Sequence, residues 1–288
     1  MLALARNIAG LQGAAELLEE VIVVNNASTA DYSAVRDFMA DNEHIPFRYI
    51  DAPSNLGVAK GRNFAIRHGR APILIMLDDD AELKGQDSLY QLQKAFKTRE
   101  SKRPIAIVSF KVLYFSTGEM QQNAFPHKHF GRYKDRSFLE TYYYAGGAHA
   151  ITRASIEQVG MYPEDFFYGM EEYDLSFRLI DAGYSITYSD KVVMLHKESP
   201  LGRAPHREKI RMMWVNKSKV AWRYLPRIYF LSTAMMWSLE YLRKTDFDLG
   251  GWINGWKEVV AIPGGEQRKP INIASKNYLR MTGARLWY

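Results

Sequence analysis

The chain has 288 residues, of which 47% are hydrophobic and 24% are charged, so it can form one large globular domain with an appendage. It has no cysteine, which excludes disulfides and thiolate metal sites and agrees with a reducing, cytoplasmic location. Residues 197–288 hold 17 Lys and Arg against 7 Asp and Glu, a net of +10, whereas the whole chain is only +6. We therefore expect a boundary near residue 200, before a basic C-terminal part.

The first half of the chain alternates between buried strands and helices. Helical spacing covers residues 2–19, 31–41 and 55–70, and short apolar strands are predicted at 21–24, 47–50 and 73–77. This alternation predicts an α/β domain with a mixed, mostly parallel sheet flanked by helices.

The second half is more irregular. We predict helices at 89–99, 155–159 and 171–182, and strands at 105–112, 184–188 and 192–195, with an irregular segment over 114–138. Two amphipathic helices are expected after residue 200, at 207–224 and 228–244, followed by about forty residues of weaker periodicity. No run reaches the roughly 18 apolar residues that a transmembrane helix needs.

Three carboxylates, Asp78, Asp79 and Asp80, follow the apolar strand that ends at Leu77. Adjacent acids repel one another unless a cation lies among them. Oxygen ligands at positions i and i+2 suit Mg²⁺ or Mn²⁺, and such a metal in turn suits a diphosphate. By itself, the triplet is equally compatible with a solvated acidic turn.

Other polar clusters are expected at the same edge of the sheet. Asn25, the pair Gly146–Gly147 and His196 follow or flank predicted strands, and an acidic cluster at residues 171–174 opens a helix. In open α/β sheets, the carboxyl ends of the strands converge on one crevice, where ligands bind.

Six motifs occur in a fixed order: VVNNAS (23–28), NLGVAKGRN (55–63), LDDD (77–80), AGGAHAITR (145–153), YPEDFFYGMEEYDLSFRL (162–179) and His196. Together they resemble a family 2 glycosyltransferase of the GT-A (Rossmann-like) fold, of the bacterial surface-polysaccharide kind, over roughly residues 10–197. The resemblance implies a catalytic domain for nucleotide sugar and acceptor at residues 1–200 and a basic, mainly helical extension at 201–288.

The resemblance also implies the reaction. An inverting, metal-dependent enzyme would move a sugar from a UDP- or dTDP-linked donor to a hydroxyl of a glycan or lipid-linked acceptor in polysaccharide or lipopolysaccharide biosynthesis. Asp80, His196 and Asp78 match the positions around Mn²⁺ or Mg²⁺, with Asp78 nearer the ribose. Glu172 matches the catalytic base. The residues implied in acceptor binding are Glu171, Gly146 and Gly147.

Seven residues are implied in nucleotide binding: Asn25, Asn55, Gly57, Arg62, Asn63, Asp78 and Asp79, the last expected to point elsewhere. Arg62 is a candidate for the diphosphate charge, and a surface arginine is the alternative. For the acids at 171–174, the alternative is simple stabilisation of a helix N-terminus. His127 and His129 are interpreted as loop residues.

The sequence departs from the family in two places. Asn25 replaces an aspartate that accepts the N3–H of the base, although an amide carbonyl can accept the same bond. The family's first strand is not visible before residue 10, so we expect an N-terminally truncated form with weak nucleotide binding. Its neighbouring strands would be left unpaired or forced together. The alternative function is a non-catalytic scaffold or interaction protein with an impaired nucleotide pocket.

The basic C-terminal part is rich in Trp and Met, which is compatible with peripheral contact on the inner face of the cytoplasmic membrane. A helical packing extension and a homodimer contact are the alternatives. No nucleic-acid partner is expected, because the basic charge is confined to this part and no recognition motif accompanies it.

Overall fold

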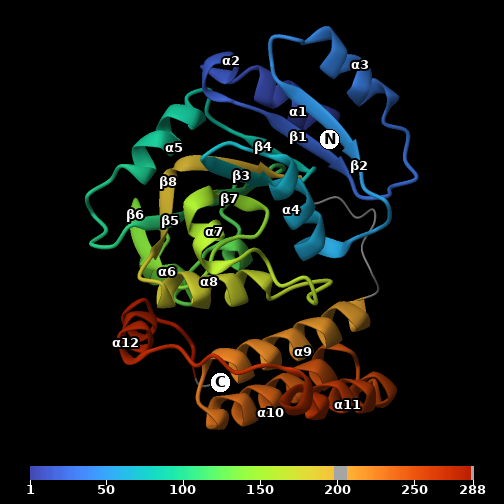
Figure 1. Cartoon of the computed structure of the whole chain (residues 1–288), viewed down its shortest axis with the longest axis vertical. Helices are drawn as coiled ribbons and strands as arrows, with labels where there is room; N and C mark the ends of the chain where they lie inside the picture. Colours follow the sequence, from blue (N-terminus) through green and yellow to red (C-terminus); the bar gives the residue numbers. More distant parts are fainter. Residues whose placement is uncertain (198–205, 287–288) are drawn as a thin grey trace.

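The computed structural model describes residues 1–197 and 206–286. An α/β unit precedes this gap and a layer of helices follows it (Figure 1). The boundary predicted near residue 200 falls in the gap and so lies outside the described residues.

The strands form two sheets. A parallel pair joins β1 (Val21–Asn25) to β2 (Phe47–Asp51). The larger sheet has the order β3-β7-β5-β8-β4, and β6 also pairs with β8. Its strands are β3 (Ile73–Leu77), β4 (Ala81–Leu83), β5 (Ile105–Tyr114), β6 (Phe138–Thr141), β7 (Ala148–Thr152) and β8 (Ser185–His196).

The mixed sheet is confirmed, but the expectation that it is mostly parallel is wrong. In the described part of the chain, only the β1–β2 and β5–β8 pairs are parallel, whereas β3–β7, β5–β7, β4–β8 and β6–β8 are antiparallel. Helix-linked crossovers produce parallel strands, and the alternation of helices and strands holds only as far as β3. The chain then turns back within three residues, between Leu77 and Ala81, so the acidic triplet occupies a tight reversal.

Among the residues that the structure describes, β1 pairs only with β2, and β3 pairs only with β7. The other edge of each strand has no hydrogen-bonded strand beside it. Glu20, just before β1, accepts hydrogen bonds from the backbone N–H groups of Arg70 and Ala71, just before β3. Val21 and Ile73 also pack against the same apolar core. The two strands therefore lie close together at their start without pairing, which is the first of the two outcomes expected for them.

Helices cover both faces of the larger sheet (Figure 1). Along β5 and β7, alternate side chains enter two different cores: Ile107 and Ile151 join one core, and Val108 and Ala150 join the other. The helices of this unit are α1 (Leu2–Ala9), α2 (Ala14–Leu17), α3 (Ser33–Asp41), α4 (Gly57–His68), α5 (Ser88–Phe96), α6 (Phe130–Tyr133), α7 (Arg153–Val159) and α8 (Glu171–Asp181), with a 3₁₀ turn η1 (Gln122–Ala124).

Three boundaries differ from the sequence-based prediction. The helix expected over residues 2–19 is interrupted between α1 and α2, where Gly13 has a positive φ of 75°. The two strands expected at 184–188 and 192–195 form the single strand β8. The weakly periodic end of the chain forms two further helices, α11 (Leu249–Gly265) and α12 (Ile273–Met281).

The helical layer is built around Trp214. This side chain lies on α9 (His206–Tyr224), is fully buried, and donates from Nε1 to the carbonyl of Ala234 on α10 (Arg227–Lys244) at 2.9 Å. Gly255 of α11 packs directly against the indole, and a Cβ there would lie 2.2 Å from Cζ3 of Trp214. Within the described residues, no helix is long and apolar enough to cross a membrane.

The contact between Gly255 and Trp214 predicts a large local effect on stability. Gly255→Ala should lower the free energy of unfolding by about 2 kcal/mol, because a methyl group added to a filled core forces the indole aside. Gly264→Ala is the matched control, since no atom lies within 4 Å of its added Cβ. Chemical denaturation measures both, and equal stability of G255A and the wild type would contradict the packing described.

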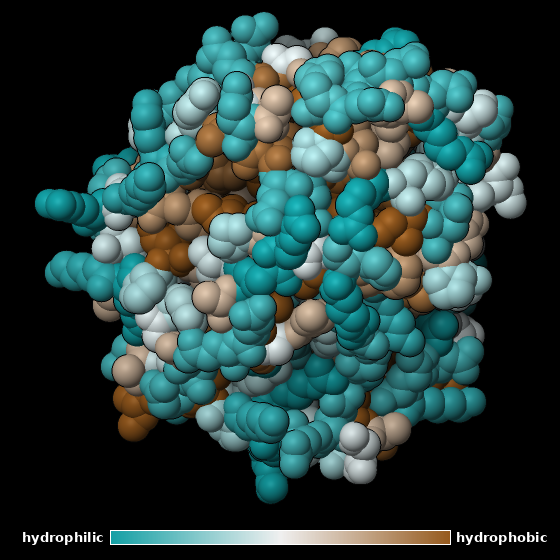
Figure 2. Space-filling view, turned by 45° about the horizontal axis from the view of Figure 1, so that its top comes forward, coloured by the Kyte–Doolittle hydropathy of each residue, from teal (hydrophilic) through white to brown (hydrophobic). Residues whose placement is uncertain are grey.

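The face with the β1–β2 end turned forward is largely hydrophilic (Figure 2). Apolar side chains are visible there mainly in hollows between hydrophilic ones. This pattern is ordinary for a globular protein.

Candidate active site

The acidic triplet lies beside the glycine pair because β3 and β7 are paired. Leu77 is opposite Ala148, and the Asp78 N–H donates to the carbonyl of Gly147 at 3.3 Å. A Cβ on Gly147 would lie only 2.1 Å from Oδ2 of Asp78. A glycine is therefore required for the Asp78 carboxylate to occupy this position.

His196 reaches the same turn from the end of β8. The pairing of β4 with β8 sets Ala81 opposite His196, and the imidazole Nε2 lies 3.3 Å from Oδ1 of Asp80. The other ring nitrogen, Nδ1, lies 3.1 Å from Oε1 of Gln121, which fixes the orientation of the ring. The structure thus brings together Asp80 and His196, two of the three residues that the sequence proposes for the metal site.

The acids of α8 face the other side of the glycine pair. Glu171 and Glu172 share Arg62 of α4, whose Nη1 lies 3.0 Å from Oε1 of Glu171 and 3.1 Å from Oε1 of Glu172. The Arg62 side chain is 14% exposed and also lies over the ring of Tyr162, so the alternative of a surface arginine is wrong. In this arrangement Arg62 binds the carboxylates of α8; its contact with a diphosphate stays a prediction.

The glycine pair joins these two groups of residues. A Cβ on Gly146 would lie 1.9 Å from Oε1 of Glu172 and 2.8 Å from Nη2 of Arg62, just as one on Gly147 would strike Asp78. Asp78, Gly147, Gly146 and Glu172 therefore form one continuous line of contacts from β3 to α8.

Burial raises the pKa of Glu171 to about 8, and the neighbouring charge of Glu172 adds to the effect, while Arg62 opposes it. The second carboxyl oxygen of Glu171, Oε2, is buried without a hydrogen-bond partner among the described residues. Asp78 is exposed at the surface, but desolvation by the protein around its carboxyl raises the pKa of this group; Arg62 opposes the rise and Asp80 adds to it. The site therefore holds more carboxylate than its cations neutralise.

The raised pKa of Glu171 predicts a pH-dependent effect on stability. Between the unperturbed value of 4.5 and about 8, the folded state keeps a proton that the unfolded state has lost, so stability falls as pH rises through this window. Glu171→Gln removes this dependence. Relative to the wild type, E171Q should therefore gain up to about 1.4 kcal/mol per pH unit across the window and nothing further above it.

Denaturant unfolding at several pH values measures this difference. Glu157→Gln, at an exposed position of α7, is the matched control, and its difference from the wild type should stay constant. Parallel stability curves for E171Q and the wild type would contradict the raised pKa.

A buried support beneath the site was not predicted from the sequence. His149 of β7 is fully buried, with Nε2 2.9 Å from the Tyr162 hydroxyl and Nδ1 3.1 Å from the carbonyl of Ala145. Burial lowers the pKa of His149 to about 3, so the ring is neutral at pH 7. Tyr144 also lies within 3.2 Å of the Tyr162 hydroxyl. Aromatic and histidine residues around the glycine pair were the available signal, but they did not reveal which side chains point inward.

The predicted nucleotide residues divide into two groups. Asn25 lies at the end of β1, where its carbonyl accepts the Ser28 N–H and its amide donates to Asp51, both at 2.9 Å. Asn55 is exposed and accepts the Gly57 N–H at 3.0 Å. Both remain predicted nucleotide contacts.

Gly57 and Asn63 are buried. Gly57 is buried with a φ of 71°, and a Cβ there would lie 2.6 Å from the carbonyl oxygen of Phe167. Asn63 is 1% exposed, donates to the Tyr162 carbonyl at 2.9 Å and accepts the Tyr162 N–H at 3.0 Å. Protein atoms already surround both residues, and their contact with a nucleotide stays a prediction. Asp79 is exposed, and its expected orientation away from the site stays a prediction.

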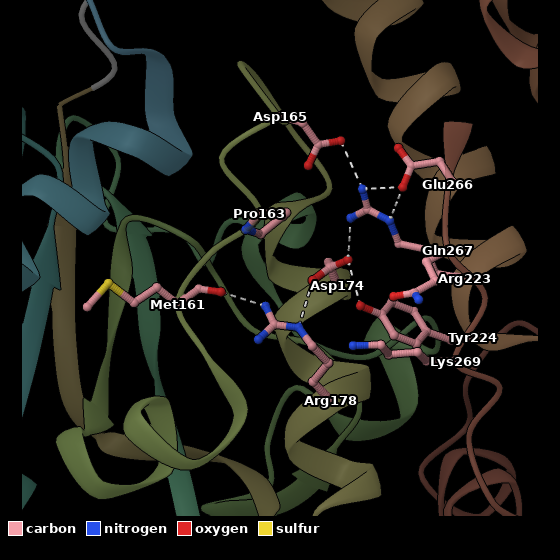
Figure 3. A pocket seen from close by; sticks show the side chains of 10 residues that line it. All are labelled: Met161, Pro163, Asp165, Asp174, Arg178, Arg223, Tyr224, Glu266, Gln267 and Lys269. Carbon is pink, nitrogen blue, oxygen red and sulfur yellow. Dashed lines mark hydrogen bonds and ion pairs between the residues drawn. The ribbon is translucent and has the colours of Figure 1, made fainter. Parts of the chain in front are cut away.

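A second polar cluster anchors α8 to the helical layer (Figure 3). Asp174 is 2% exposed and binds Nε of Arg178 at 2.9 Å, Nη1 of Arg223 at 2.8 Å and the Tyr224 hydroxyl at 2.9 Å. Arg223 also pairs with Glu266. These groups line a hollow of about 290 Å³ that no predicted site residue enters. The cluster therefore orients the helix that carries Glu172.

Removing Arg223 should be costly. Arg223→Ala leaves Asp174 buried with one cation fewer, which should lower the free energy of unfolding by about 3 kcal/mol. Arg243→Ala is the control, because Arg243 makes its ion pair with Glu240 from a side chain that is 69% exposed, and its loss should cost less than about 0.5 kcal/mol. Thermal or chemical denaturation that ranks R243A as the less stable variant would contradict this assignment.

Comparison with known protein families shows to which family the chain belongs. The profile described as "Glycosyl transferase family 2" matches residues 3–160, more than half of the chain. The chain belongs to glycosyl transferase family 2. Its GT-A fold and its activity class, glycosyl transfer, are those that the motifs predicted.

The name of one relative agrees with this assignment. The uncharacterized glycosyltransferase YfnE of Bacillus subtilis (strain 168) is 28% identical over 232 residues, which cover 63% of this chain and 57% of YfnE. This chain thus matches little more than half of YfnE.

Two solved structures share the fold. The mannosyltransferase PcManGT from Pyrobaculum calidifontis, in complex with GDP-Man and Mn²⁺, aligns with a TM-score of 0.59 at 17% identity, covering 97% of this chain and 74% of PcManGT. S. aureus TarS 1–349 in complex with UDP aligns with a TM-score of 0.58 at 14% identity, covering 90% of this chain and 75% of TarS. At these identities the likeness shows the fold alone.

Proposed function

We propose that this family 2 glycosyltransferase is a metal-dependent, inverting enzyme. It moves a sugar from a nucleoside-diphosphate donor to a hydroxyl group of a glycan or lipid-linked acceptor. The observation that carries the proposal is the line of contacts from Asp80 and His196, through Asp78 and the glycine pair, to Glu172. It sets candidate metal ligands and a candidate base on two sides of one glycine loop.

The donor atoms at the end of β3 fit a divalent cation. One carboxylate and one imidazole, from Asp80 and His196, lie 3.3 Å apart. No group of three or more metal-ligating side chains is present in residues 1–197 and 206–286. Mg²⁺ commonly takes only one or two protein carboxylates, with substrate phosphates and water completing its shell. The pair therefore suits Mn²⁺ or Mg²⁺ that arrives with a diphosphate, and Asp78 would lie beside it.

A bound metal would supply charge neutralisation for the leaving diphosphate. The remaining steps belong to the chain. Glu172 takes the proton of the acceptor hydroxyl, and the acceptor oxygen forms a bond to the anomeric carbon as the bond to the diphosphate breaks. Attack from the side opposite the leaving group inverts the configuration. Glu171, with its raised pKa, can donate a hydrogen bond to the acceptor.

The likeness to PcManGT and TarS supports a nucleotide-sugar donor, since those structures hold GDP-Man and UDP. The motifs predict UDP or dTDP as the nucleotide that carries the sugar, with Asn25 beside its base. We place the reaction in polysaccharide or lipopolysaccharide biosynthesis on the cytoplasmic side of the membrane, as the motif resemblance implies.

Release of nucleoside diphosphate tests the proposal. The chain is incubated with UDP-, dTDP- and GDP-linked sugars in Mn²⁺, in Mg²⁺ and in EDTA. At least one donor should be turned over in metal, and EDTA should stop the reaction until metal is restored. The absence of metal-dependent turnover with every donor would overturn the proposal.

Two observations favour the alternative, a non-catalytic scaffold or interaction protein. The Asn25 amide is already engaged by Ser28 and Asp51, and β1 has an unpaired edge within the described part of the chain. Titration calorimetry with UDP and dTDP in Mn²⁺ separates the two functions. Micromolar binding would exclude an impaired nucleotide pocket.

A further inference from the structure

The helical layer carries an apolar surface that none of its own helices covers. On α10, Ile228, Leu231, Met235 and Leu239 recur every three or four residues, which sets them along one face of the helix. Each of them is more than half exposed, and Leu231 is 60% exposed. Side chains exposed to this extent bury little apolar area within the protein itself.

A second stripe lies on α11. Leu249, Ile253 and Val260 are all exposed, Val260 to 70%, and Phe247 in the preceding turn is exposed to 71%. An open hollow of about 760 Å³ connects the two stripes. It is lined by Met235 from α10 and by Trp252, Ile253, Trp256, Lys257 and Val260 from α11. The two stripes therefore form one surface, which we call the α10–α11 face.

The two helices that carry the α10–α11 face lie beyond α9 from the α/β unit. Helix α9 packs against α8 on one side, and α10 and α11 pack against α9 from the other (Figure 1). Soluble monomers seldom expose a continuous apolar patch of this extent unless a partner or a membrane covers it.

Charge decides which partner fits. Residues 206–286 hold 15 Lys and Arg against 6 Asp and Glu, a net of +9. Two of the acids on these helices are already paired, Glu240 with Arg243 and Lys244, and Glu258 with Arg211. Exposed cations remain at the face itself, where Arg227 precedes Ile228 and Lys257 lines the hollow.

A second copy of the chain would bring two strongly basic layers together across a twofold axis, and their like charges would repel. An anionic bilayer attracts the same charge and accepts the apolar side chains at its interface. We propose that the α10–α11 face docks this protein on an anionic phospholipid bilayer, lying in the interface without crossing it. The proposal rests on this surface and not on the proposed activity.

Sedimentation with vesicles tests the docking directly. The chain is mixed with vesicles of phosphatidylcholine alone or of phosphatidylcholine with phosphatidylglycerol. It should sediment with the anionic vesicles at least about tenfold more strongly, and added salt should weaken the binding. Trp252 and Trp256 line the hollow, so brominated acyl chains should quench tryptophan fluorescence.

The double variant L231Q/L239Q removes two exposed side chains of the stripe and should weaken vesicle binding about tenfold or more. The double variant I273Q/M281Q is the matched control, because both side chains are exposed on α12, outside the α10–α11 face. It should bind as the wild type does. Circular dichroism checks that both variants are folded.

Three results would overturn the proposal: no preference for anionic vesicles, equal binding by L231Q/L239Q and the wild type, or a dimer in analytical ultracentrifugation that L231Q/L239Q dissociates without affecting vesicle binding. The last result would assign the face to a second copy of the chain.

Discussion

Replacing Glu172 with Gln should lower the turnover number by about 10²–10⁴-fold, the usual contribution of a positioned general base. Glutamine keeps the size of the side chain and can still accept a hydrogen bond, but it cannot take the acceptor's proton. The Michaelis constant for the donor should change little, because the donor's diphosphate is expected at the end of β3 and not at α8.

Glu157→Gln controls for the general effect of removing one carboxylate, since Glu157 is exposed on the neighbouring helix α7. It should retain full activity. Glu171→Gln should act mainly on the Michaelis constant of the acceptor. If E172Q transferred the donor sugar to the acceptor as fast as the wild type does, Glu172 could not be the base.

Gly147→Ala should reduce activity by about 10²-fold or more, since displacing reacting groups by an ångström has effects of that size. The added Cβ would lie 2.1 Å from Oδ2 and 2.3 Å from Cγ of Asp78, so the carboxylate must leave its position. Gly146→Ala should have a similar effect through Glu172, whose Oε1 would lie 1.9 Å from the new methyl group.

The two variants should fail differently. G147A should weaken binding of metal and donor, whereas G146A should lower turnover with the donor still bound. Gly131→Ala is the control, because no atom lies within 4 Å of its added Cβ, and it should behave as the wild type does. Full activity of both G146A and G147A, with both variants folded, would show that the carboxylates have room to move and do not depend on the glycine pair.

The order of strands and helices up to β3 followed from hydrophobic periodicity, since each element there is amphipathic or wholly apolar. The strands β4, β6 and β7 were not predicted, and neither was their antiparallel pairing, because such pairing depends on where the chain turns and not on the apolar pattern. The helices α11 and α12 were missed for a related reason. Exposed apolar residues, such as Val260 on α11 and Ile273 and Met281 on α12, obscure the usual contrast between a buried and a solvent face.

The site could be predicted to the level of residue types. The carboxyl ends of strands were expected to converge, and Asp80 and His196 do lie together. The sequence did not predict which other side chain each site residue contacts. Arg62 is bound to Glu171 and Glu172, and Asn63 is turned toward Tyr162, because long-range packing between α4 and the segment before α8 decides both. His149 was not predicted, because its burial depends on how the surrounding helices and strands pack, which the local sequence does not show.

Titration calorimetry of nucleoside diphosphates into three forms of the chain tests the central claim most directly, that one end of the site binds metal and donor and the other performs the proton transfer. UDP, dTDP and GDP are titrated into the wild type, Asp80→Asn and Glu172→Gln, with Mn²⁺ and with EDTA. At least one nucleotide should bind the wild type and E172Q equally in Mn²⁺, and EDTA or D80N should weaken that binding by about tenfold or more, which corresponds to about 1.4 kcal/mol. Binding that survives EDTA and D80N, or that is lost in E172Q, would contradict this division of the site.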